Sequence, residues 1–468
     1  MSEIFAITYL MNLKITAKRR PMLAIDGISL PASKSISNRM LLLRTLSGGR
    51  IRLHNISDCD DTIAMEQGLK SAKVRELESS EGQLPAIIDI GAAGTAMRFL
   101  TAYFATTEGQ DVVITGTERM RHRPIGVLVD ALRSMGADIC YDGEDGYPPL
   151  HIKGRQLEGG TISLPGNVSS QYISALLMVA PAMQKGLTLN IVGEVISRPY
   201  ICITTSLMRR FGISIEEPDN HTIIVRPGKY QGGEYTIEND WSAASYWYEI
   251  LALAPQGEVR LHGLFADSLQ GDSCVSRLFE PLGITTEFDE NGAVLRKSSR
   301  DNGQWSMPKA SRAARRLSAE PVPTSKSRES EAAIINDLTT CPDLAQTMVA
   351  TCCGMGIAFH FSGLQSLRIK ETDRLLALRQ ELGKLGYQIN EHDGSVLESG
   401  AKKSEIANSH LSDISIDTYN DHRMAMCMAP LAVLCEDGLI INDAQVVSKS
   451  YPTFWDDLKT AGYGVERL

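Results

Sequence analysis

The chain repeats one pattern of apolar and polar positions. An amphipathic helix ends in a glycine, and a short strand rich in β-branched residues follows, as in residues 207–215 and 382–389. A glycine at this position supplies the left-handed residue with which many helices end. The pattern occurs at Gly136, Gly212, Gly283, Gly386 and Gly462. The sequence therefore predicts an α/β protein in which helices and strands alternate.

The spacing of these glycines indicates an internal repeat. Successive glycines are 76, 71, 103 and 76 residues apart, and the longest interval contains residues 296–331. That segment is rich in Ser, Lys and Arg and has almost no apolar periodicity, so we expect a flexible insertion. Without it, the remaining 432 residues correspond to six units of 72. Six such units fit two domains of three units better than a solenoid, because no capping repeats are visible.

Composition narrows the possible functions. The net charge of −9 argues against a nucleic-acid or anionic-membrane binder, whose surface would be rich in Lys and Arg. The longest apolar run, residues 424–435, is too short to cross a bilayer, and no export signal is visible. The nine cysteines form no C-x-x-C pair, and the histidines form no H-E-x-x-H motif. We therefore expect a cytoplasmic protein with reduced cysteines and no bound metal.

Two polar motifs begin predicted helices near the N-terminus. PASKSISNR places Lys34, Ser35 and Arg39 at a helix start, where free backbone N–H groups attract anions. Taken alone, this motif is more simply a capped helix with solvated cations. GAAGTAMR would let the main chain at Gly94 approach a phosphate or carboxylate closely, but it is neither a P-loop nor G-x-G-x-x-G.

Two further motifs follow in the same half of the chain. Residues 119–123 contain three arginines, which predict either a solvated surface or an anion clamp. Ser169, Ser170 and Gln171 stand at another helix start, where N-capping explains only one of the two serines.

The second half of the chain contains a set of charged residues at the ends of predicted units. They are Asp343, Lys370, Glu371, Arg374, Arg423 and Lys449. Ion-pair networks would account for them without any chemistry. Because cations recur beside carboxylates or hydroxyls in five or six separate units, the sequence favours a cleft for a multiply charged ligand.

Eight motifs occur in one order along the chain: PASKSISNR, GTAMR, RMRHRPIG, SSQY, SRPY, IKETDR, TYNDHRMAM and SKSYPTF. In this combination the chain resembles the 5-enolpyruvylshikimate-3-phosphate synthases, the 3-phosphoshikimate 1-carboxyvinyltransferase family, from Leu30 to the C-terminus apart from residues 296–331. The resemblance implies a two-domain inside-out α/β barrel of six βαβαββ units, three per domain. One domain would comprise residues 1–31 and 240–468, and the other residues 32–239.

The resemblance also implies an addition–elimination without metal or cofactor, in the shikimate pathway to chorismate and the aromatic amino acids. The 5-hydroxyl of shikimate 3-phosphate would attack C2 of phosphoenolpyruvate while C3 is protonated, and the intermediate would then lose phosphate and a proton. By motif, Asp343 would be the base for the hydroxyl, while Lys34 and Glu371 would handle protons at the reacting carbons.

The same resemblance implies two sets of substrate ligands. Shikimate 3-phosphate would contact Lys34, Ser35, Arg39, Ser169, Ser170, Gln171, Ser197, Tyr200, Asp343 and Lys370. Phosphoenolpyruvate would contact Lys34, Gly94, Arg119, Gln171, Arg374, Arg423 and Lys449. The inhibitor glyphosate would occupy the phosphoenolpyruvate subsite. Asp240 matches an acid of the family's cleft to which no definite role is assigned.

Three positions depart from the family pattern, namely Ala92, Phe99 and Ser366. We expect these departures to change the affinity for the substrates and not the type of reaction. An alternative is a UDP-N-acetylglucosamine enolpyruvyl transferase, but that relative uses a loop cysteine and residues 111–139 contain none. A non-catalytic relative that binds anions through the basic insertion is a second alternative. We expect a monomer that binds small molecules and neither nucleic acid nor membrane.

Overall fold

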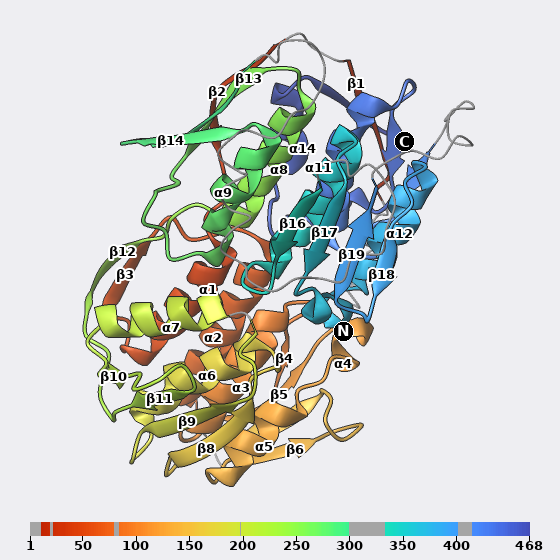
Figure 1. The fold of residues 1–468 in the computed structure, drawn as a ribbon. Coiled ribbons are helices and arrows are strands. Elements are labelled where there is room, and N and C mark those ends of the chain that lie inside the picture. The colour runs from red at the N-terminus through yellow and green to blue at the C-terminus, as the bar shows by residue number, and fades with distance from the viewer. Residues whose placement is uncertain (1–10, 19–21, 79–83, 197, 299–332, 401–413) are drawn as a thin grey trace. The chain divides into compact units, whose positions relative to one another are not determined.

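The computed structural model describes residues 11–18, 22–78, 84–196, 198–298, 333–400 and 414–468, and these form two compact units (Figure 1). Unit 1 comprises the described residues of Met1–Leu30, Trp241–Ala266 and Asp272–Leu468. Unit 2 comprises those of Pro31–Asp240 and Asp267–Gly271. Helices and strands alternate along both units, so the predicted α/β class is confirmed.

Unit 2 contains two four-stranded sheets of the same topology. In the order β4-β5-β7-β6, the first pair is parallel and is connected through α3, and the next two pairings are antiparallel. The elements are β4 (Ala86–Asp89), α3 (Gly94–Thr106), β5 (Asp111–Thr115), α4 (Glu118–Arg121), α5 (Gly126–Ser134), β6 (Asp138–Tyr141) and β7 (Leu150–Lys153). The second sheet, in the order β8-β9-β11-β10, repeats this arrangement with α6 between its parallel strands. Its elements are β8 (Gly160–Pro165), α6 (Ser170–Val179), β9 (Leu187–Val192), α7 (Arg198–Arg210), β10 (Ile215–Glu216) and β11 (Thr222–Val225).

The third sheet of unit 2 is a parallel pair, β3 and β12. Its elements and neighbours are α1 (Lys34–Leu46), β3 (Ile51–His54), α2 (Asp60–Glu78) and β12 (Gly233–Thr236). Inside unit 2, α6 buries every residue from Tyr172 to Val179 and packs against α3 and α7. A helix that is buried on all sides belongs to a core, which explains why its sequence shows so little amphipathic pattern.

Unit 1 contains three four-stranded sheets in which the first pairing is parallel and the next two are antiparallel, in the orders β2-β13-β15-β14, β16-β17-β19-β18 and β20-β21-β1-β22. The first is built from β2 (Leu23–Ser29), α8 (Trp241–Leu253), β13 (Gly257–His262), α9 (Val275–Phe279), β14 (Thr285–Asp289) and β15 (Gly292–Lys297). The second is built from β16 (Ile334–Asp337), α11 (Ala345–Met355), β17 (Phe359–Ser362), α12 (Arg374–Lys384), β18 (Asn390–His392) and β19 (Val396–Ser399). The third is built from β20 (Ser415–Ile416), α13 (His422–Met428), β21 (Leu439–Ile441), α14 (Phe454–Thr460), β22 (Tyr463–Arg467) and the early strand β1 (Leu13–Ala17).

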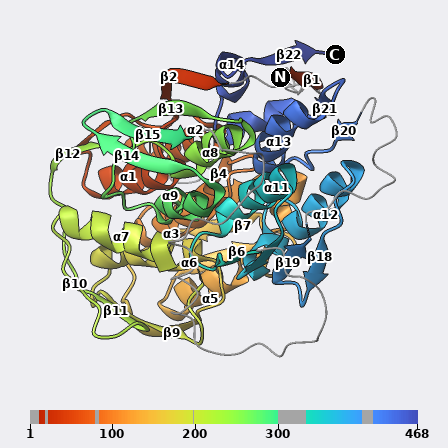
Figure 2. The same cartoon turned by 45° about the horizontal axis from the view of Figure 1, so that its top comes forward.

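The core of unit 1 lies among α8, α11 and α13, which pack against one another (Figure 2). The apolar run that begins at Met424 forms α13 and the 3₁₀ turn after it, and nearly all of it is buried. Within the described ranges, no helix combines the length and the apolar character needed to cross a membrane.

The glycines of the repeat have the conformation that the pattern predicts. All five have positive φ values, between +85° and +98°, and each stands between a helix and a following strand or extended segment. A side chain would be strained in this left-handed region, so the helix–glycine–strand interpretation is confirmed.

Two local expectations need correction. The insertion predicted for residues 296–331 falls mostly on residues 299–332, outside the described residues, but it begins too early, because β15 continues through Lys297. Lys297 is buried and donates hydrogen bonds to the carbonyls of Ala252 and Ala254, which anchors the strand end. At the start of α1, Ser33 does not cap the helix, because its side chain accepts no hydrogen bond from the first turn. Its hydroxyl donates to Gln270 Oε1 at 3.0 Å.

One acidic side chain lies in the core of unit 1. Glu249 of α8 is wholly buried, and neither carboxyl oxygen has a hydrogen-bond partner among the described residues. Burial raises the pKa of Glu249 well above its ordinary value of 4.5, because an apolar environment disfavours the charged form. The native protein therefore retains a proton on Glu249 that the unfolded chain releases at pH values above this ordinary pKa.

Because only the folded state holds this proton, the free energy of unfolding falls as the pH rises above the pKa that Glu249 has in the unfolded chain. We predict that Glu249→Gln removes this dependence on pH. Above pH 5, the unfolding free energy of the variant minus that of wild type should therefore increase by up to about 1.4 kcal/mol per pH unit. Urea unfolding between pH 5 and 8 measures it, with exposed Glu287→Gln as control. A difference between Glu249→Gln and wild type that does not change with pH would contradict the assignment.

Candidate active site

A cluster of charged residues surrounds Arg374, the first residue of α12 in unit 1. Its side chain is only 2% exposed. Its Nε lies 2.7 Å from Asp421 Oδ2, its Nη1 2.9 Å from Asp343 Oδ1, and its Nη2 2.9 Å from Glu371 Oε2. The three carboxylates come from three separate segments of the chain, and one planar guanidinium holds them all.

The positions of these acids follow from local helix-start chemistry. Asp421 is the N-cap of α13 and accepts a hydrogen bond from the backbone N–H of Arg423. Asp343 lies in the 3₁₀ turn Pro342–Leu344, directly before α11. Asp373 caps α12 and so fixes where Arg374 begins that helix. Free N–H groups at helix starts favour nearby carboxylates, and the helix starts of unit 1 thus bring these acids to Arg374.

Three more cations surround the same carboxylates. Lys370 Nζ lies 3.6 Å from Asp343 Oδ1, and Arg423 Nη2 lies 3.2 Å from Asp343 Oδ2. Lys449 Nζ lies 3.3 Å from Glu371 Oε1. Four cations therefore face three carboxylates, which leaves the cluster with a surplus of positive charge.

The electrostatics keep Arg374 charged. Burial by itself lowers the pKa of Arg374, but Asp421, Glu371 and Asp343 together raise it above its ordinary value. The side chains of Asp343 and Glu371 keep 12% and 14% exposure, whereas Asp421 has none. Asp343 and Glu371 are thus the two carboxylates of the cluster that a ligand can reach.

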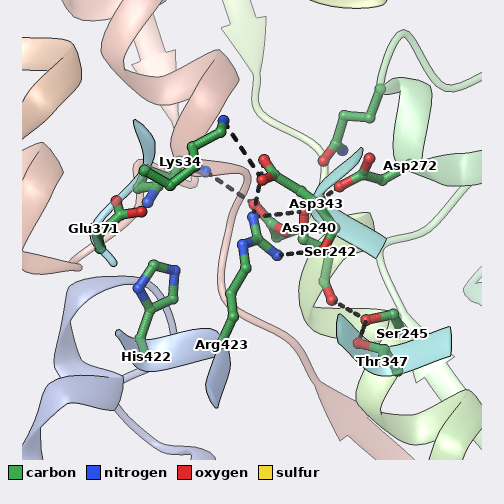
Figure 3. Close-up of polar contacts among 12 residues, drawn as sticks. Lys34, Asp240, Ser242, Ser245, Asp272, Asp343, Thr347, Glu371, His422 and Arg423 are labelled. Carbon is green, nitrogen blue, oxygen red and sulfur yellow. Dashed lines mark hydrogen bonds and ion pairs between the residues drawn. The ribbon is translucent and has the colours of Figure 1, made fainter. Parts of the chain in front are cut away.

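In unit 2, Lys34 begins α1 between two acids. Its Nζ lies 3.3 Å from Asp61 Oδ2. Its backbone N–H donates to Asp240 Oδ2 at 3.2 Å (Figure 3). The Lys34 side chain is 16% exposed. The ammonium group is thus held in place while it stays within reach of solvent.

Arg39, one turn further along α1, is directed into the protein. Its guanidinium donates to Thr204 Oγ1 at 2.8 Å, to the Ser35 carbonyl at 2.8 Å, and to Ser174 Oγ at 3.1 Å. It also donates to the Tyr200 carbonyl and lies 5.5 Å from the ring centroid of Phe99. Burial lowers the pKa of Arg39 to about 10, so the side chain remains protonated at neutral pH.

The starts of α3 and α6 meet through one hydrogen bond. Ser169 caps α6 by accepting from the backbone N–H of Gln171 at 3.3 Å, as expected for one of the paired serines. Gln171 Nε2 donates to Thr95 Oγ1 at 3.0 Å. Beside this contact, a Cβ at Gly94 would lie 2.5 Å from Nη1 of Arg123, so the flexible end of that arginine covers the glycine.

The other residues predicted to bind substrate lie outside the ion-pair cluster around Arg374. Ser35 and Tyr200 are partly buried, Ser170 is buried at the start of α6, and Arg119 is exposed on α4. Ser197 lies outside the described residues. Of the positions that depart from the family pattern, Ala92 is exposed, Phe99 is wholly buried, and Ser366 has a buried hydroxyl with no hydrogen-bond partner in the described structure.

Sequence reasoning missed the acids that hold the cations. Asp61 pairs with Lys34, and Asp421 pairs with Arg374, but neither was assigned that role. The signal in the sequence was an acid close to the start of a helix, since Asp61 is in the first turn of α2 and Asp421 is the N-cap of α13. Among the described residues, no three His, Cys, Asp or Glu side chains form a group that could hold a metal ion.

Comparisons with known proteins give a consistent result. The sequence profile of EPSP synthase (3-phosphoshikimate 1-carboxyvinyltransferase) matches residues 24–458. The 3-phosphoshikimate 1-carboxyvinyltransferase of Bacteroides fragilis (strain YCH46) is 47% identical over 439 residues, which covers 94% of this chain and 96% of the relative. That of Photobacterium damsela subsp. piscicida is 36% identical, with 94% and 98% covered.

Solved structures support the same fold. An EPSP synthase from Acinetobacter baumannii superimposes with a TM-score of 0.71 at 20% identity and covers 98% of this chain and 100% of its own. The enolpyruvyl transferase NikO from Streptomyces tendae gives a TM-score of 0.67 at 13% identity, with 98% and 99% covered. The predicted inside-out barrel of repeated βαβαββ units agrees with these neighbours. The chain belongs to the EPSP synthase (3-phosphoshikimate 1-carboxyvinyltransferase) family.

Proposed function

We propose that this chain transfers the enolpyruvyl group of phosphoenolpyruvate to the 5-hydroxyl of shikimate 3-phosphate and releases phosphate. The observation that carries the proposal is the cluster around Arg374, in which Asp343 and Glu371 are held on a buried guanidinium and flanked by cations. Relatives of the same family named 3-phosphoshikimate 1-carboxyvinyltransferase support the choice of substrates.

The charges of the cluster suit these substrates. Each substrate carries a phosphate and a carboxylate, and such groups are bound best by guanidinium and ammonium donors. In this proposal phosphoenolpyruvate contacts Lys34, Gly94, Arg119, Gln171, Arg374, Arg423 and Lys449. Shikimate 3-phosphate contacts Lys34, Ser35, Arg39, Ser169, Ser170, Gln171, Ser197, Tyr200, Asp343 and Lys370. Binding of an anion would displace part of the ion-pair network, for instance the contact between Lys449 and Glu371.

The carboxylates would move the protons. Asp343 accepts the proton of the 5-hydroxyl as the oxygen attacks C2, while Lys34 or Glu371 protonates C3. The tetrahedral intermediate then expels phosphate, and a base removes one methyl proton to restore the double bond. Asp343 and Glu371 both contact Arg374, which supports a fixed distance between the two proton-transfer groups.

In this proposal the protein is a cytoplasmic monomer with two domains. One domain comprises residues 1–31 and 240–468, and the other comprises residues 32–239. The nine free cysteines, most of them buried, support a reducing compartment. Glyphosate is expected to compete with phosphoenolpyruvate at Gly94, where Arg123 rather than backbone would meet an added side chain.

We predict that the purified chain releases phosphate from phosphoenolpyruvate with shikimate 3-phosphate and not with UDP-N-acetylglucosamine. A continuous phosphate assay with each acceptor measures this, and glyphosate in the same assay should raise the KM for phosphoenolpyruvate without lowering kcat. Phosphate release only with the nucleotide sugar would favour the alternative transferase. Binding of both substrates without release would favour a non-catalytic relative.

We predict that Asp343→Asn and Lys34→Ala each lower kcat by at least about 10²-fold, because a general acid or base contributes about 10²–10⁴-fold. The assay is the same phosphate release at saturating substrates. Exposed Asp456→Asn and Lys459→Ala, which break a surface ion pair, serve as matched controls and should keep wild-type kcat. Near wild-type kcat for Asp343→Asn would remove that residue from the proton transfer.

A further inference from the structure

A line of three polar side chains leads from a buried carboxylate to the candidate active site of unit 1. Asp272 lies in the 3₁₀ turn Gly271–Cys274 and is 5% exposed. The hydroxyl of Ser242, the second residue of α8, donates to Asp272 Oδ2. Arg423 Nη2 in turn lies 3.4 Å from Ser242 Oγ (Figure 3). Neither of these two contacts involves Arg374 or the three carboxylates that it binds.

The direction of these hydrogen bonds is fixed by chemistry. A serine hydroxyl has one proton, and an ionised carboxylate can only accept. Because that proton points at Asp272, the lone pairs of Ser242 Oγ are available to the N–H groups of Arg423. Without the carboxylate, the hydroxyl would be free to turn its proton towards the guanidinium, which cannot accept it.

Ser242 contacts the same nitrogen of Arg423 that faces Asp343. Arg423 Nη2 lies 3.2 Å from Asp343 Oδ2, and Nη1 donates to the Asp343 carbonyl at 3.3 Å. Asp343 and Ser242 therefore contact the same nitrogen of the guanidinium. Loss of the Ser242 hydroxyl would remove one of the contacts that fix the orientation of Arg423 Nη2.

A second contact joins the segments that carry Asp272 and Asp343. The thiol of Cys274, two residues after Asp272, hydrogen-bonds that of Cys341, two residues before Asp343. The 3₁₀ turn of Asp272 thus lies against the turn that carries the candidate base.

We propose that Ser242 and Asp272 are positioning residues that orient the Arg423 guanidinium for an anionic group of phosphoenolpyruvate. This inference rests on the proposed function, in which Arg423 contacts that substrate. Neither residue touches substrate in the proposal, since both act through Arg423. Because they act in series, removal of either one should have the same effect as removal of both.

The test compares the kinetics of five variants with wild type. We expect Ser242→Ala and Asp272→Ala each to raise the KM for phosphoenolpyruvate about tenfold, the effect of a lost hydrogen bond to a charged group. The KM for shikimate 3-phosphate should stay within about twofold, because Arg423 is not among its proposed ligands. Ser242→Thr, which keeps the hydroxyl, should recover most of the loss, and the double variant should match the single variants.

Ser245→Ala is the matched control. Ser245 lies one turn further along α8, is wholly buried, and bonds the Ser242 carbonyl at 2.6 Å and Thr347 Oγ1 at 3.0 Å (Figure 3). It should keep the wild-type KM for phosphoenolpyruvate even if thermal unfolding shows a loss of stability. An equal rise of KM in Ser245→Ala and Ser242→Ala would show a general effect on α8 and overturn the proposal.

A crystal structure of Ser242→Ala separates this inference from the proposed function. We expect the Arg423 guanidinium to rotate away from the position of the lost Ser242 hydroxyl while it keeps its ion pair with Asp343. An unmoved guanidinium together with an unchanged KM would overturn the positioning role. Additive effects in the double variant would show that Asp272 does not act through Ser242. If wild type releases no phosphate at all, the proposed function fails, while the position of Arg423 in the variant still decides whether Ser242 orients it.

Discussion

The buried guanidinium of Arg374 is the interaction on which the active-site half of unit 1 depends. Three carboxylates share it at 2.7 to 2.9 Å, and one of them, Asp421, has no exposure to solvent. A buried charge without partners costs several kcal/mol, so neither the arginine nor Asp421 can be buried alone. The starts of α12 and α13 and the turn before α11 are thereby held together, because each of them supplies a residue to this group.

The binding of Asp343 and Glu371 by Arg374 also determines what the site can do chemically. Arg374 contacts one oxygen of Asp343 and one oxygen of Glu371, and Arg423 and Lys449 contact the other oxygen of each. Lys370 lies beside the Asp343 oxygen that Arg374 contacts. The carboxylates are therefore fixed before any substrate arrives, and the surplus cation attracts anions. Preorganised charges of this kind stabilise a developing charge without reorganisation during the reaction. In unit 2, Lys34 is fixed in a similar way by Asp61 and Asp240.

Local patterns in the sequence predicted more of the fold than of the site. Each repeat glycine could be found because a left-handed helix end requires that residue, and the structure gives all five a positive φ. The end of β15 was missed because Lys297 looks like part of a polar insertion, whereas its buried ammonium bonds backbone carbonyls of α8 and the turn after it. The pairing of Lys34 with Asp61 and the line from Asp272 to Arg423 were missed because they join residues far apart in the chain, and no local pattern encodes such pairs.

The most direct test of this account is the stability of Arg374→Met at neutral pH, with Arg379→Met as the matched control on the same helix. Arg379 makes an exposed ion pair with Glu391, so its loss should change the unfolding free energy by at most about 1 kcal/mol. Arg374→Met leaves three carboxylates without their shared cation, and we predict a loss of about 3–5 kcal/mol in urea unfolding. A loss no larger than that of Arg379→Met would contradict the claim that the site is built on this buried arginine.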